Sequence, residues 1–526
     1  MSERWRTILG AVLLLAFCLI LFLPGFTSLP VIDRDEARFA QASRQMLAGN
    51  DFIDIRFQDE IRYRKPVGIY WAQAASASVI GRDEIWPYRL PSLIGAVFAV
   101  LLTYTIGVRL FGVRTAMIGA GLLALSPILG FEARCAKTDA VLLALVCASM
   151  VFLWHIRTHI QSRRIPAFAL WVALALGILV KGPIIAMIVG LTVFCLWALN
   201  RDRAWIARLH PRAGLLVLTV FVLPWFIAIT IISGGDFWNE TIGHDLLSKL
   251  AGEHESHGAP PGAYMLGTLV GLWPGALFLL LGLPWIWKNR TRDSVRFLLL
   301  WALPAWAVFE MTPTKLPHYV LPLYPALALL AAAALTEGLP GRSLRRMTAI
   351  LAVVLGLALG VAIIAIPILV DGALMPAALL AGLAFWTLTV LIWYGLWTGK
   401  LLRGTICGGW ITAALALILT FGQVLPYLDA PWLTEKLVAM LDGQRSLALI
   451  GYHEPSAVFR LGTATALIDP CDVTAFRAAH PDGVLVVDAA RLETVRAAHP
   501  DLRITGQVDG FHYNKSRTDR LTLLVP

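Results

Sequence analysis

The chain has 526 residues, of which 58% are hydrophobic and 15% are charged, and its mean hydropathy is +0.71. Soluble globular proteins carry about a quarter charged residues and fewer than half apolar ones. These values exclude a cytosolic enzyme, a disordered chain and a fibrous protein, and they indicate a polytopic membrane protein. The formal net charge of +10 could suggest a nucleic-acid partner, but the placement of the charges argues otherwise.

Apolar segments long enough to cross a membrane follow one another along most of the chain. A membrane-spanning helix needs about 20 mostly apolar residues. The sequence predicts about thirteen such helices, a count with a margin of one or two because three segments are short. The segments are 7–28, 89–111, 113–131, 139–156, 166–181, 184–199, 213–233, 263–287, 295–311, 318–336, 347–370, 375–398 and 404–424.

Every second loop between these segments is short and basic. The basic residues run from Arg4 and Arg6 before the first segment to Lys400 and Arg403 before the last. The positive-inside rule places these loops and the N-terminus in the cytoplasm. An odd number of spans then puts the C-terminal region outside. Anionic lipid headgroups account for the basic excess, so membrane lipids are expected partners and nucleic acid is not.

The composition changes after residue 430, which divides the chain into a membrane domain at 1–430 and a C-terminal domain at 431–526. In the tail, short β-like strings (SLALIGY, GVLVVDA and LTLLVP) alternate with helical stretches at 472–480 and 489–499. This alternation predicts a small soluble α/β domain on the periplasmic side.

Two long outward loops, 29–88 and 234–262, complete the predicted membrane domain. Residues 35–47 and 67–80 of the first loop mix apolar and polar side chains at helical spacing. This spacing predicts two amphipathic helices that lie on the membrane surface.

Ionisable residues stand directly at the outward ends of several spans. Such groups are costly at membrane depth and usually line a cavity or a substrate path. A single lysine can also reach the interface from a helix end without any function. Several on one side therefore suggest a polar chamber that opens outward. They are Lys137, Asp139, Lys181, Lys315 and His318.

Such a chamber would suit the transfer of a polar group from a lipid carrier. A lipid phosphate needs cations, and a departing phosphate needs its growing charge stabilised. A carboxylate such as Asp35 or Asp139 could act as a general base on the acceptor. These residues by themselves leave a transporter or a flippase equally open. The candidate cations are Arg38, Lys65, Lys181 and Lys315.

An ordered set of motifs resembles the polyprenyl-phosphate-sugar glycosyltransferases, in particular the aminoarabinose (lipid A) transferases and the protein-mannosyltransferase-like enzymes. The resemblance covers roughly residues 10–430. The matching motifs are DEARFA at 35–40, YRKP at 63–66, Tyr70-Trp71, Asp139, KGP at 181–183, and KLPHYVLPLYPA at 315–326.

The resemblance implies an all-α membrane domain with the C-type glycosyltransferase fold, in the inner membrane of a bacterium. It further implies a glycosyltransferase that moves a sugar from a polyprenyl-phosphate donor to a lipid A, lipopolysaccharide-type or other envelope acceptor. A protein O-mannosyltransferase-like enzyme and a lipid-linked-sugar flippase or transporter remain the alternatives.

The family roles carry over to individual positions. Asp35 and Asp139 resemble the two acidic residues of the active site. The residues that would hold the donor phosphate are Arg38, Lys65, Lys181, Lys315, His318 and Tyr319. Further candidates are Glu36, Tyr63, Lys249, His244 and His257.

One departure concerns a metal. The aminoarabinose transferases carry a glutamate of a metal site before the Lys-Pro pair, where this chain has Arg64. No cofactor is therefore assigned, and the substitution argues against a bound divalent metal. His244, His254 and His257 could still ligate a metal, or they are ordinary polar residues of a loop.

Overall fold

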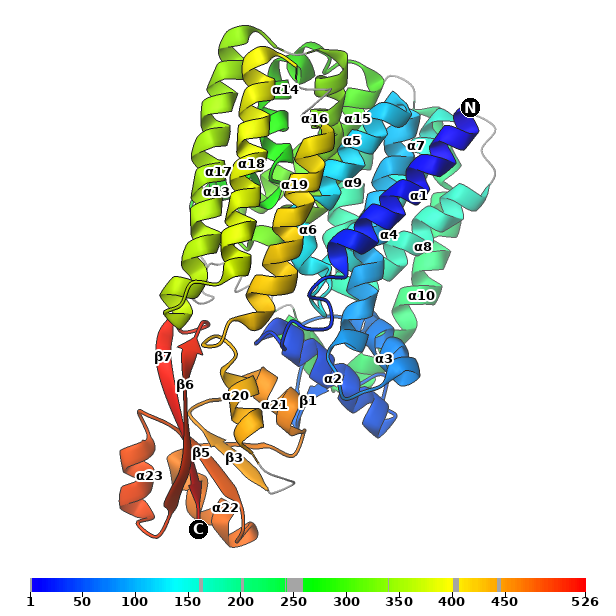
Figure 1. Ribbon diagram of the computed structural model, residues 1–526. Helices are drawn as coiled ribbons and strands as arrows, with labels where there is room; N and C mark the ends of the chain where they lie inside the picture. Colours follow the sequence, from blue (N-terminus) through cyan, green and yellow to red (C-terminus); the bar gives the residue numbers. More distant parts are fainter. Residues whose placement is uncertain are drawn as a thin grey trace.

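A computed structural model describes residues 2–159, 164–199, 203–241, 243, 259–338, 340–400, 406–441 and 446–526. It consists of a helical bundle and a small domain with a β-sheet, which lies at one end of the bundle (Figure 1). The N-terminus lies at the opposite end of the bundle (Figure 1). The helices α2 and α3 lie at the same end as the sheet domain (Figure 1).

Each apolar segment predicted to span the membrane contains helix, although some are broken or end short of the predicted bounds, and the protein is a multi-pass membrane protein. Ten helices in the described part of the chain are long and apolar enough to cross a membrane, and a pair bent by 118° would be an eleventh. Two further apolar helices, α5 (Val113–Ala124) and α9 (Ile184–Leu199), are shorter. By length alone the count is thus lower than thirteen, because these two segments and the bent pair fall short of a straight span.

The other helices of the bundle vary widely in length. The helices are α1 (Glu3–Phe22), α4 (Trp86–Phe111), α6 (Pro127–Glu132), α7 (Asp139–Thr158), α8 (Arg164–Lys181), α10 (Pro211–Ile232), α15 (Asp293–Met311), α16 (Tyr324–Glu337), α17 (Arg342–Asp371), α18 (Pro376–Thr398) and α19 (Ile406–Leu419). The bent pair is α13 (Ala263–Gly271) and α14 (Gly275–Lys288).

A break divides the predicted segment 113–131 into α5 and α6. Ser126 accepts a hydrogen bond from the backbone N of Leu129, and Pro127 occupies the first turn of α6. Serine at the N-cap and proline at the first helical position both favour the start of a new helix. This break places Glu132, the last residue of α6, at the same end of the bundle as the start of α7.

Helices α4 and α7 approach each other closely beside the start of α7. A Cβ atom added to Gly95 of α4 would lie 2.8 Å from the backbone of Ala140. Since real Cβ atoms do not come this close, glycine is required at position 95. The contact fixes the position of Asp139, which directly precedes Ala140.

The loop between α1 and α4 contains the two predicted helices, α2 (Asp35–Gly49) and α3 (Gly68–Ile80), joined by a short hairpin of β1 (Arg56–Phe57) and β2 (Glu60–Ile61). Helix α2 buries Ala37, Phe39 and Met46 on its apolar face and ends at Asn50, which adopts a left-handed conformation. Asparagine tolerates this conformation better than most residues, which explains the end of the helix there.

The C-terminal domain is built around a five-stranded sheet with the order β4-β3-β5-β7-β6. Strand β3 is parallel to β4 and β5, whereas β7 is antiparallel to β5 and β6. The predicted α/β character of the tail is therefore confirmed. The elements are α20 (Leu433–Met440), β3 (Leu447–Ile450), α21 (Pro455–Leu461), β4 (Ala466–Ile468), α22 (Val473–Ala479), β5 (Val484–Asp488), α23 (Leu492–Ala498), β6 (Arg503–His512) and β7 (Arg517–Val525).

Candidate functional site

The ends of several helices bring charged side chains together at the end of the bundle near α2. Asp139 is the first residue of α7 and Lys181 is the last residue of α8. Because α7 and α8 are neighbouring helices that run in opposite directions, these two residues meet. The ammonium group of Lys181 donates a hydrogen bond to Oδ1 of Asp139. Both side chains are at least 90% buried, so the pair is shielded from bulk solvent.

A second acid and a second lysine extend this cluster. Nζ of Lys137 lies 2.9 Å from Oε1 of Glu132. The imidazole of His318 lies between the two carboxylates, 3.8 Å from Glu132 and 3.9 Å from Asp139. His318 belongs to the 3-10 helix η3 (Pro317–Leu323), which precedes α16. The cluster thus joins residues from α6, α7, α8 and η3.

The two lysines of this cluster, Lys137 and Lys181, also interact with groups beyond their paired carboxylates. The ammonium group of Lys181 lies 5.5 Å from the ring centre of Tyr319, within the range of a cation–π interaction. Burial lowers the pKa of Lys137, but the charges of Glu132 and Asp139 raise it more, so its pKa lies above the ordinary value. Lys137 therefore stays positively charged at neutral pH.

Asp35 lies at the solvent-exposed start of α2 and faces this positive region. Reduced hydration raises the pKa of its carboxyl group. The surrounding positive charges, led by Lys137 and Arg62, lower the pKa more, so the value falls below the ordinary 3.8. Asp35 is therefore an exposed carboxylate at neutral pH, as a group that takes a proton from an acceptor must be.

Arg62 is a charged residue of this region that was not among the predicted site residues. It is 8% exposed, its guanidinium lies 5.2 Å from the ring centre of Phe39, and its Nε has no hydrogen-bond partner among the described residues. Glu132 was also missed, although a lone carboxylate at the end of an apolar run is a recognisable signal. Arg62 could have been found from its place in a short basic stretch with Arg64 and Lys65.

The predicted cations of the first loop add to the positive charge around Asp35. Arg38 lies on α2, and burial followed by the charges of Arg62 and Arg64 lowers its pKa. Lys65 contributes to the lowered pKa of Asp35. The charged neighbours that act on Asp35 are Lys137, Arg62, His318 and Lys65, and such cations suit the binding of a phosphate.

Three predicted residues have contacts that serve the protein itself. Glu36 forms an ion pair with Arg89, in which both side chains are fully buried. The hydroxyl of Tyr63 donates a 2.6 Å hydrogen bond to Asp54. Lys315 donates to the backbone carbonyl of Thr312 at 2.7 Å, so the structure gives it a backbone partner three residues away.

The remaining predictions lie outside the described residues. These are Lys249, His244, His254 and His257. Among the ranges that the structure does describe, no three His, Cys, Asp or Glu side chains are grouped closely enough to hold a metal ion. The assignment of metal ligands therefore stays a prediction.

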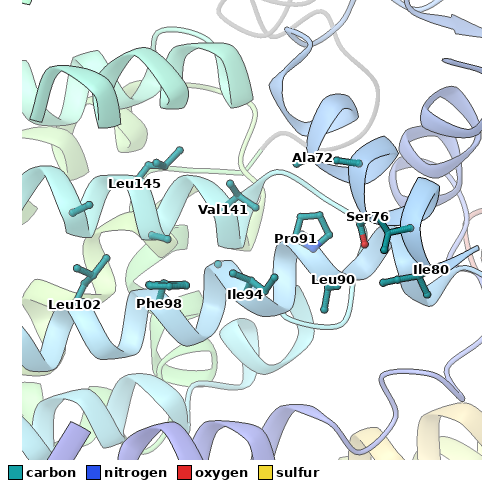
Figure 2. A pocket seen from close by; sticks show the side chains of 15 residues that line it. Ala72, Ser76, Ile80, Leu90, Pro91, Ile94, Phe98, Leu102, Val141 and Leu145 are labelled. Atoms are coloured by element: carbon teal, nitrogen blue, oxygen red, sulfur yellow. The ribbon is translucent and has the colours of Figure 1, made fainter. Parts of the chain in front are cut away.

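An apolar groove lies beside the cluster, between α3, α4 and α7 (Figure 2). Its volume is about 640 Å³. Val141, two residues after Asp139, lies at one part of the groove, and Ala72, Phe98 and Ala144 also line it. Figure 2 shows mostly hydrocarbon side chains pointing into this space. Its chemistry suits a hydrocarbon chain rather than a sugar.

Sequence comparisons relate the chain to enzymes that use lipid-linked sugars. Residues 64–227 match the family described as dolichyl-phosphate-mannose-protein mannosyltransferase. An undecaprenyl phosphate-α-4-amino-4-deoxy-L-arabinose arabinosyl transferase of Pseudomonas fluorescens is 32% identical over 345 residues, which are 64% of this chain and 61% of that protein. The corresponding enzyme of Pseudomonas aeruginosa is 30% identical over 58% of this chain and 56% of its own. The matches thus span about three fifths of these relatives.

The fold is similar over the whole chain to that of solved transferases. The structure of ArnT from Cupriavidus metallidurans bound to undecaprenyl phosphate has a TM-score of 0.75 at 18% identity, with 99% of this chain and 98% of that chain covered. An oligosaccharyltransferase from Archaeoglobus fulgidus has a TM-score of 0.55 at 12% identity, with 93% of this chain and 70% of that chain covered. The resemblance seen in the motifs is confirmed: by sequence and fold, this chain is similar to the polyprenyl-phosphate-sugar glycosyltransferases of the aminoarabinose-transferase type, and it has their C-type glycosyltransferase fold.

Proposed function

We propose that the protein is an integral-membrane glycosyltransferase that moves a sugar from a polyprenyl-phosphate donor to a lipid A, lipopolysaccharide-type or other envelope acceptor. The observation that carries this proposal is the exposed carboxylate of Asp35 beside a region rich in cations. Sugar transfer needs a carboxylate that takes the proton of the acceptor and, beside it, cations that stabilise the departing phosphate. The similarity to the arabinosyl transferases supports the same donor class.

The transfer is a single displacement at the anomeric carbon of the donor sugar. The acceptor oxygen forms a bond to this carbon while the bond between the carbon and the phosphate oxygen breaks. The proton of the acceptor passes to Asp35, and the departing polyprenyl phosphate keeps the electron pair. Arg38, Lys65 and Lys181 stabilise the negative charge that grows on the phosphate. Such a displacement inverts the configuration of the anomeric carbon.

Asp139 has a different part in this scheme. Asp139 is 4% exposed, and its carboxylate accepts a hydrogen bond from the ammonium group of Lys181. Asp35 is therefore the more accessible base. Asp139 is therefore proposed to hold Lys181 and His318 in position against the donor phosphate.

The reaction is proposed to occur at the outer face of a bacterial inner membrane. Basic loops favour a cytoplasmic N-terminus, and the N-terminus lies at the end of the bundle opposite the soluble domain (Figure 1). The soluble domain, α2 and α3 would then face the periplasm. A tail with this placement favours an envelope lipid or glycan as acceptor over a protein.

Reconstituted proteoliposomes provide the test. Sugar transfer from a polyprenyl-phosphate donor is measured for the wild type, Asp35→Asn and Lys65→Ala, with Asp59→Asn as a control for an exposed carboxylate in the same loop. We expect transfer by the wild type and the control and strong losses in the other two variants. Retained transfer in both would contradict the mechanism. Translocation of the lipid without any transfer would instead identify a flippase, whose ionisable groups usually lie near the midplane of the bilayer.

A further inference from the structure

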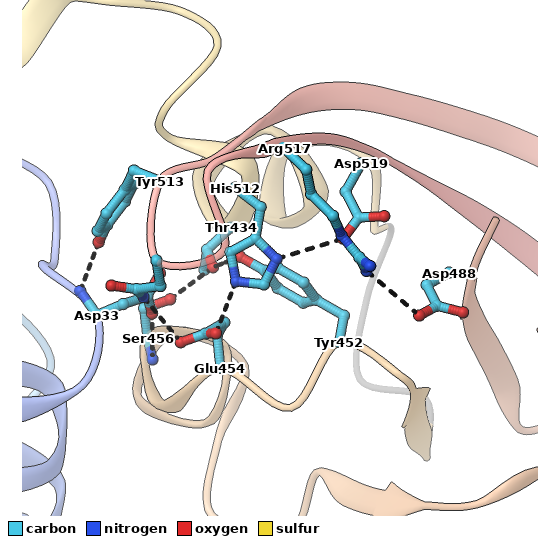
Figure 3. A network of polar contacts seen from close by, with 11 residues as sticks. Asp33, Thr434, Tyr452, Glu454, Ser456, Asp488, His512, Tyr513, Arg517 and Asp519 are labelled. Atoms are coloured by element: carbon cyan, nitrogen blue, oxygen red, sulfur yellow. Dashed lines mark hydrogen bonds and ion pairs between the residues drawn. The ribbon is translucent and has the colours of Figure 1, made fainter. Parts of the chain in front are cut away.

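The C-terminal domain binds the chain directly before Asp35. The backbone N of Asp33 donates a 2.7 Å hydrogen bond to the hydroxyl of Tyr513, and the backbone N of Ser456 donates a 3.1 Å hydrogen bond to Oδ1 of Asp33. Figure 3 shows both contacts reaching Asp33 from the soluble domain. Tyr513 lies in the turn between β6 and β7, and Ser456 lies in the first turn of α21.

The residue between Asp33 and Asp35 has a strained backbone. Arg34 has φ 66° and ψ −101°, a combination that residues with a side chain rarely adopt. Such a conformation persists only where neighbouring contacts hold it, and it occurs most often at functional sites. Because Arg34 directly precedes Asp35, its conformation sets the direction in which α2 presents the Asp35 carboxylate.

Contacts on both sides of Arg34 hold this turn. On one side, a carboxylate oxygen of Glu36 accepts a 2.9 Å hydrogen bond from the backbone N of Ile32. This contact belongs to the membrane domain, because Glu36 is paired with Arg89 of α4. On the other side, Tyr513 and Ser456 of the soluble domain hold Asp33. Contacts from both domains therefore hold the strained turn.

The groups that bind Asp33 are themselves held within the soluble domain. The hydroxyl of Thr434 lies 2.6 Å from that of Ser456 and 2.9 Å from that of Tyr452. Glu454 lies 2.7 Å from the imidazole of His512, the residue before Tyr513 (Figure 3). The start of α21 and the β6–β7 turn are thus joined, and they present Ser456 and Tyr513 as one rigid surface.

Helix α21 and the residues that follow it also contact the body of α2. A guanidinium nitrogen of Arg44 donates a 3.0 Å hydrogen bond to the carbonyl of Phe459, and the guanidinium lies 5.0 Å from the ring centre of that residue. The side-chain amide of Gln41 donates a 2.7 Å hydrogen bond to the hydroxyl of Thr463. The helix that carries Asp35 is therefore held by the soluble domain at its start and along its length.

We propose that the C-terminal domain contributes to the active site. In this proposal Tyr513 is a positioning residue, which holds the Asp33–Arg34 turn and so fixes the orientation of the Asp35 carboxylate. This inference rests on the proposed role of Asp35 as the base. Tyr513 does not touch the substrate in this scheme. Its loss should therefore lower the rate of the chemical step and leave the binding of the lipid phosphate unchanged.

The variant Tyr513→Phe removes the hydroxyl and keeps the ring. In full-length protein in proteoliposomes, we expect kcat to fall by roughly ten- to a hundred-fold, the range expected when a reacting group is slightly misplaced, with an unchanged KM for the donor. Hydrogen exchange of the amides of residues 33–36 should become faster. Tyr427→Phe, at a tyrosine that is 60% exposed, is the matched control and should change neither quantity.

A second set of variants separates positioning from general stability. Glycine adopts positive φ angles without strain, so Arg34→Gly in the Tyr513→Phe background should recover part of kcat. Arg34→Ala removes the same guanidinium but keeps the strain, and it should recover nothing. Equal behaviour of the two double variants would overturn the proposal, as would an unchanged kcat in Tyr513→Phe.

Two outcomes remain distinct from a failure of the proposed function. If Asp35→Asn abolishes transfer while Tyr513→Phe leaves kcat and exchange unchanged, only the positioning role is wrong. If the wild type transfers no sugar, the proposed function fails, and the exchange of residues 33–36 still decides whether Tyr513 holds the turn. Should Tyr513→Phe fold poorly, Asp33→Ala and Asp33→Asn test the other contact that the C-terminal domain makes with this turn, because only asparagine keeps an oxygen for the backbone N of Ser456. A lower kcat and faster exchange in Asp33→Ala than in Asp33→Asn would support positioning by the C-terminal domain, and equal values would contradict it.

Discussion

Glu36 and Arg89 form an ion pair that joins the loop between α1 and α4 to the helical bundle. Nε and Nη2 of Arg89 each lie 2.8 Å from a different carboxylate oxygen of Glu36, and both side chains are fully buried. Glu36 also accepts hydrogen bonds from the backbone N of Ile32 and, at 2.7 Å, from that of Ala136. One carboxylate therefore ties the start of α2 to α4 and to the loop that precedes α7.

Removing this carboxylate should destabilise the protein. We expect Glu36→Ala to lower the free energy of unfolding by about 3–5 kcal/mol, since it leaves Arg89 as an unpaired buried charge. Thermal unfolding in detergent measures the change. Glu60→Ala, at an exposed carboxylate of the same loop, should have little effect. A loss of transfer without any loss of stability in Glu36→Ala would contradict this assignment and point to a role in the reaction.

The pair formed by Lys181 and Asp139 should respond differently to single and double substitution. Lys181→Met leaves Asp139 as a buried charge without this partner, and we expect a loss of stability of about 3–5 kcal/mol. Adding Asp139→Asn removes that charge and should restore most of the stability. Donor binding should stay weak in the double variant, because the cation is still missing. Recovery of both properties would exclude Lys181 from the phosphate site.

The lowered pKa of Asp35 fixes the pH dependence of transfer. Because positive neighbours hold its pKa below 3.8, Asp35 keeps its charge as the pH falls to that value. The acidic limb of kcat/KM should therefore lie below pH 3.8. Arg62→Met removes one of these charges and should move the limb to higher pH. Arg56→Met, at an exposed arginine paired with Asp54, should leave it in place; a shift in both variants would argue against a local effect of Arg62.

The groove between α3, α4 and α7 should bind a hydrocarbon chain of a lipid substrate. Ala144→Phe would fill part of it and displace about two methylene groups, which corresponds to roughly a ten-fold rise in KM. The rise should appear with a long polyprenyl donor and disappear with a short-chain donor. Val354→Phe on α17, a position that is 59% exposed, is the control. If Ala144→Phe leaves the KM for both a long-chain donor and a long-chain acceptor unchanged, the groove does not bind a substrate chain and is filled by bulk membrane lipid.

The helical architecture was predictable because a membrane imposes a simple rule on sequence. Backbone groups in lipid must be satisfied within each span, so long apolar runs become helices. The break at Ser126 and Pro127 was not predicted, although both residues favour a helix start there. The two surface helices of the first loop were also predicted, because their apolar residues recur at helical spacing.

Part of the candidate site was predictable for a related reason. Charged residues at span ends are rare enough to stand out, and the structure brings Asp139, Lys181 and His318 together as one cluster. Glu132 and Arg62 were missed although each is visible as a charged residue in the sequence, because the sequence does not show which side chains lie beside them in the fold. The role of Glu36 was also open, since Arg89 lies 53 residues away.

The sequence by itself determined the membrane class, the helical segments and the α/β character of the tail, because each depends on hydrophobicity and periodicity over a short window. Only the tertiary structure decided which domain holds Asp35 in place. Asp33 and Tyr513 are 480 residues apart, and no local pattern records their hydrogen bond. Such a contact exists only once the sheet domain packs against α2, because the free energy of that packing is distributed over residues from both ends of the chain.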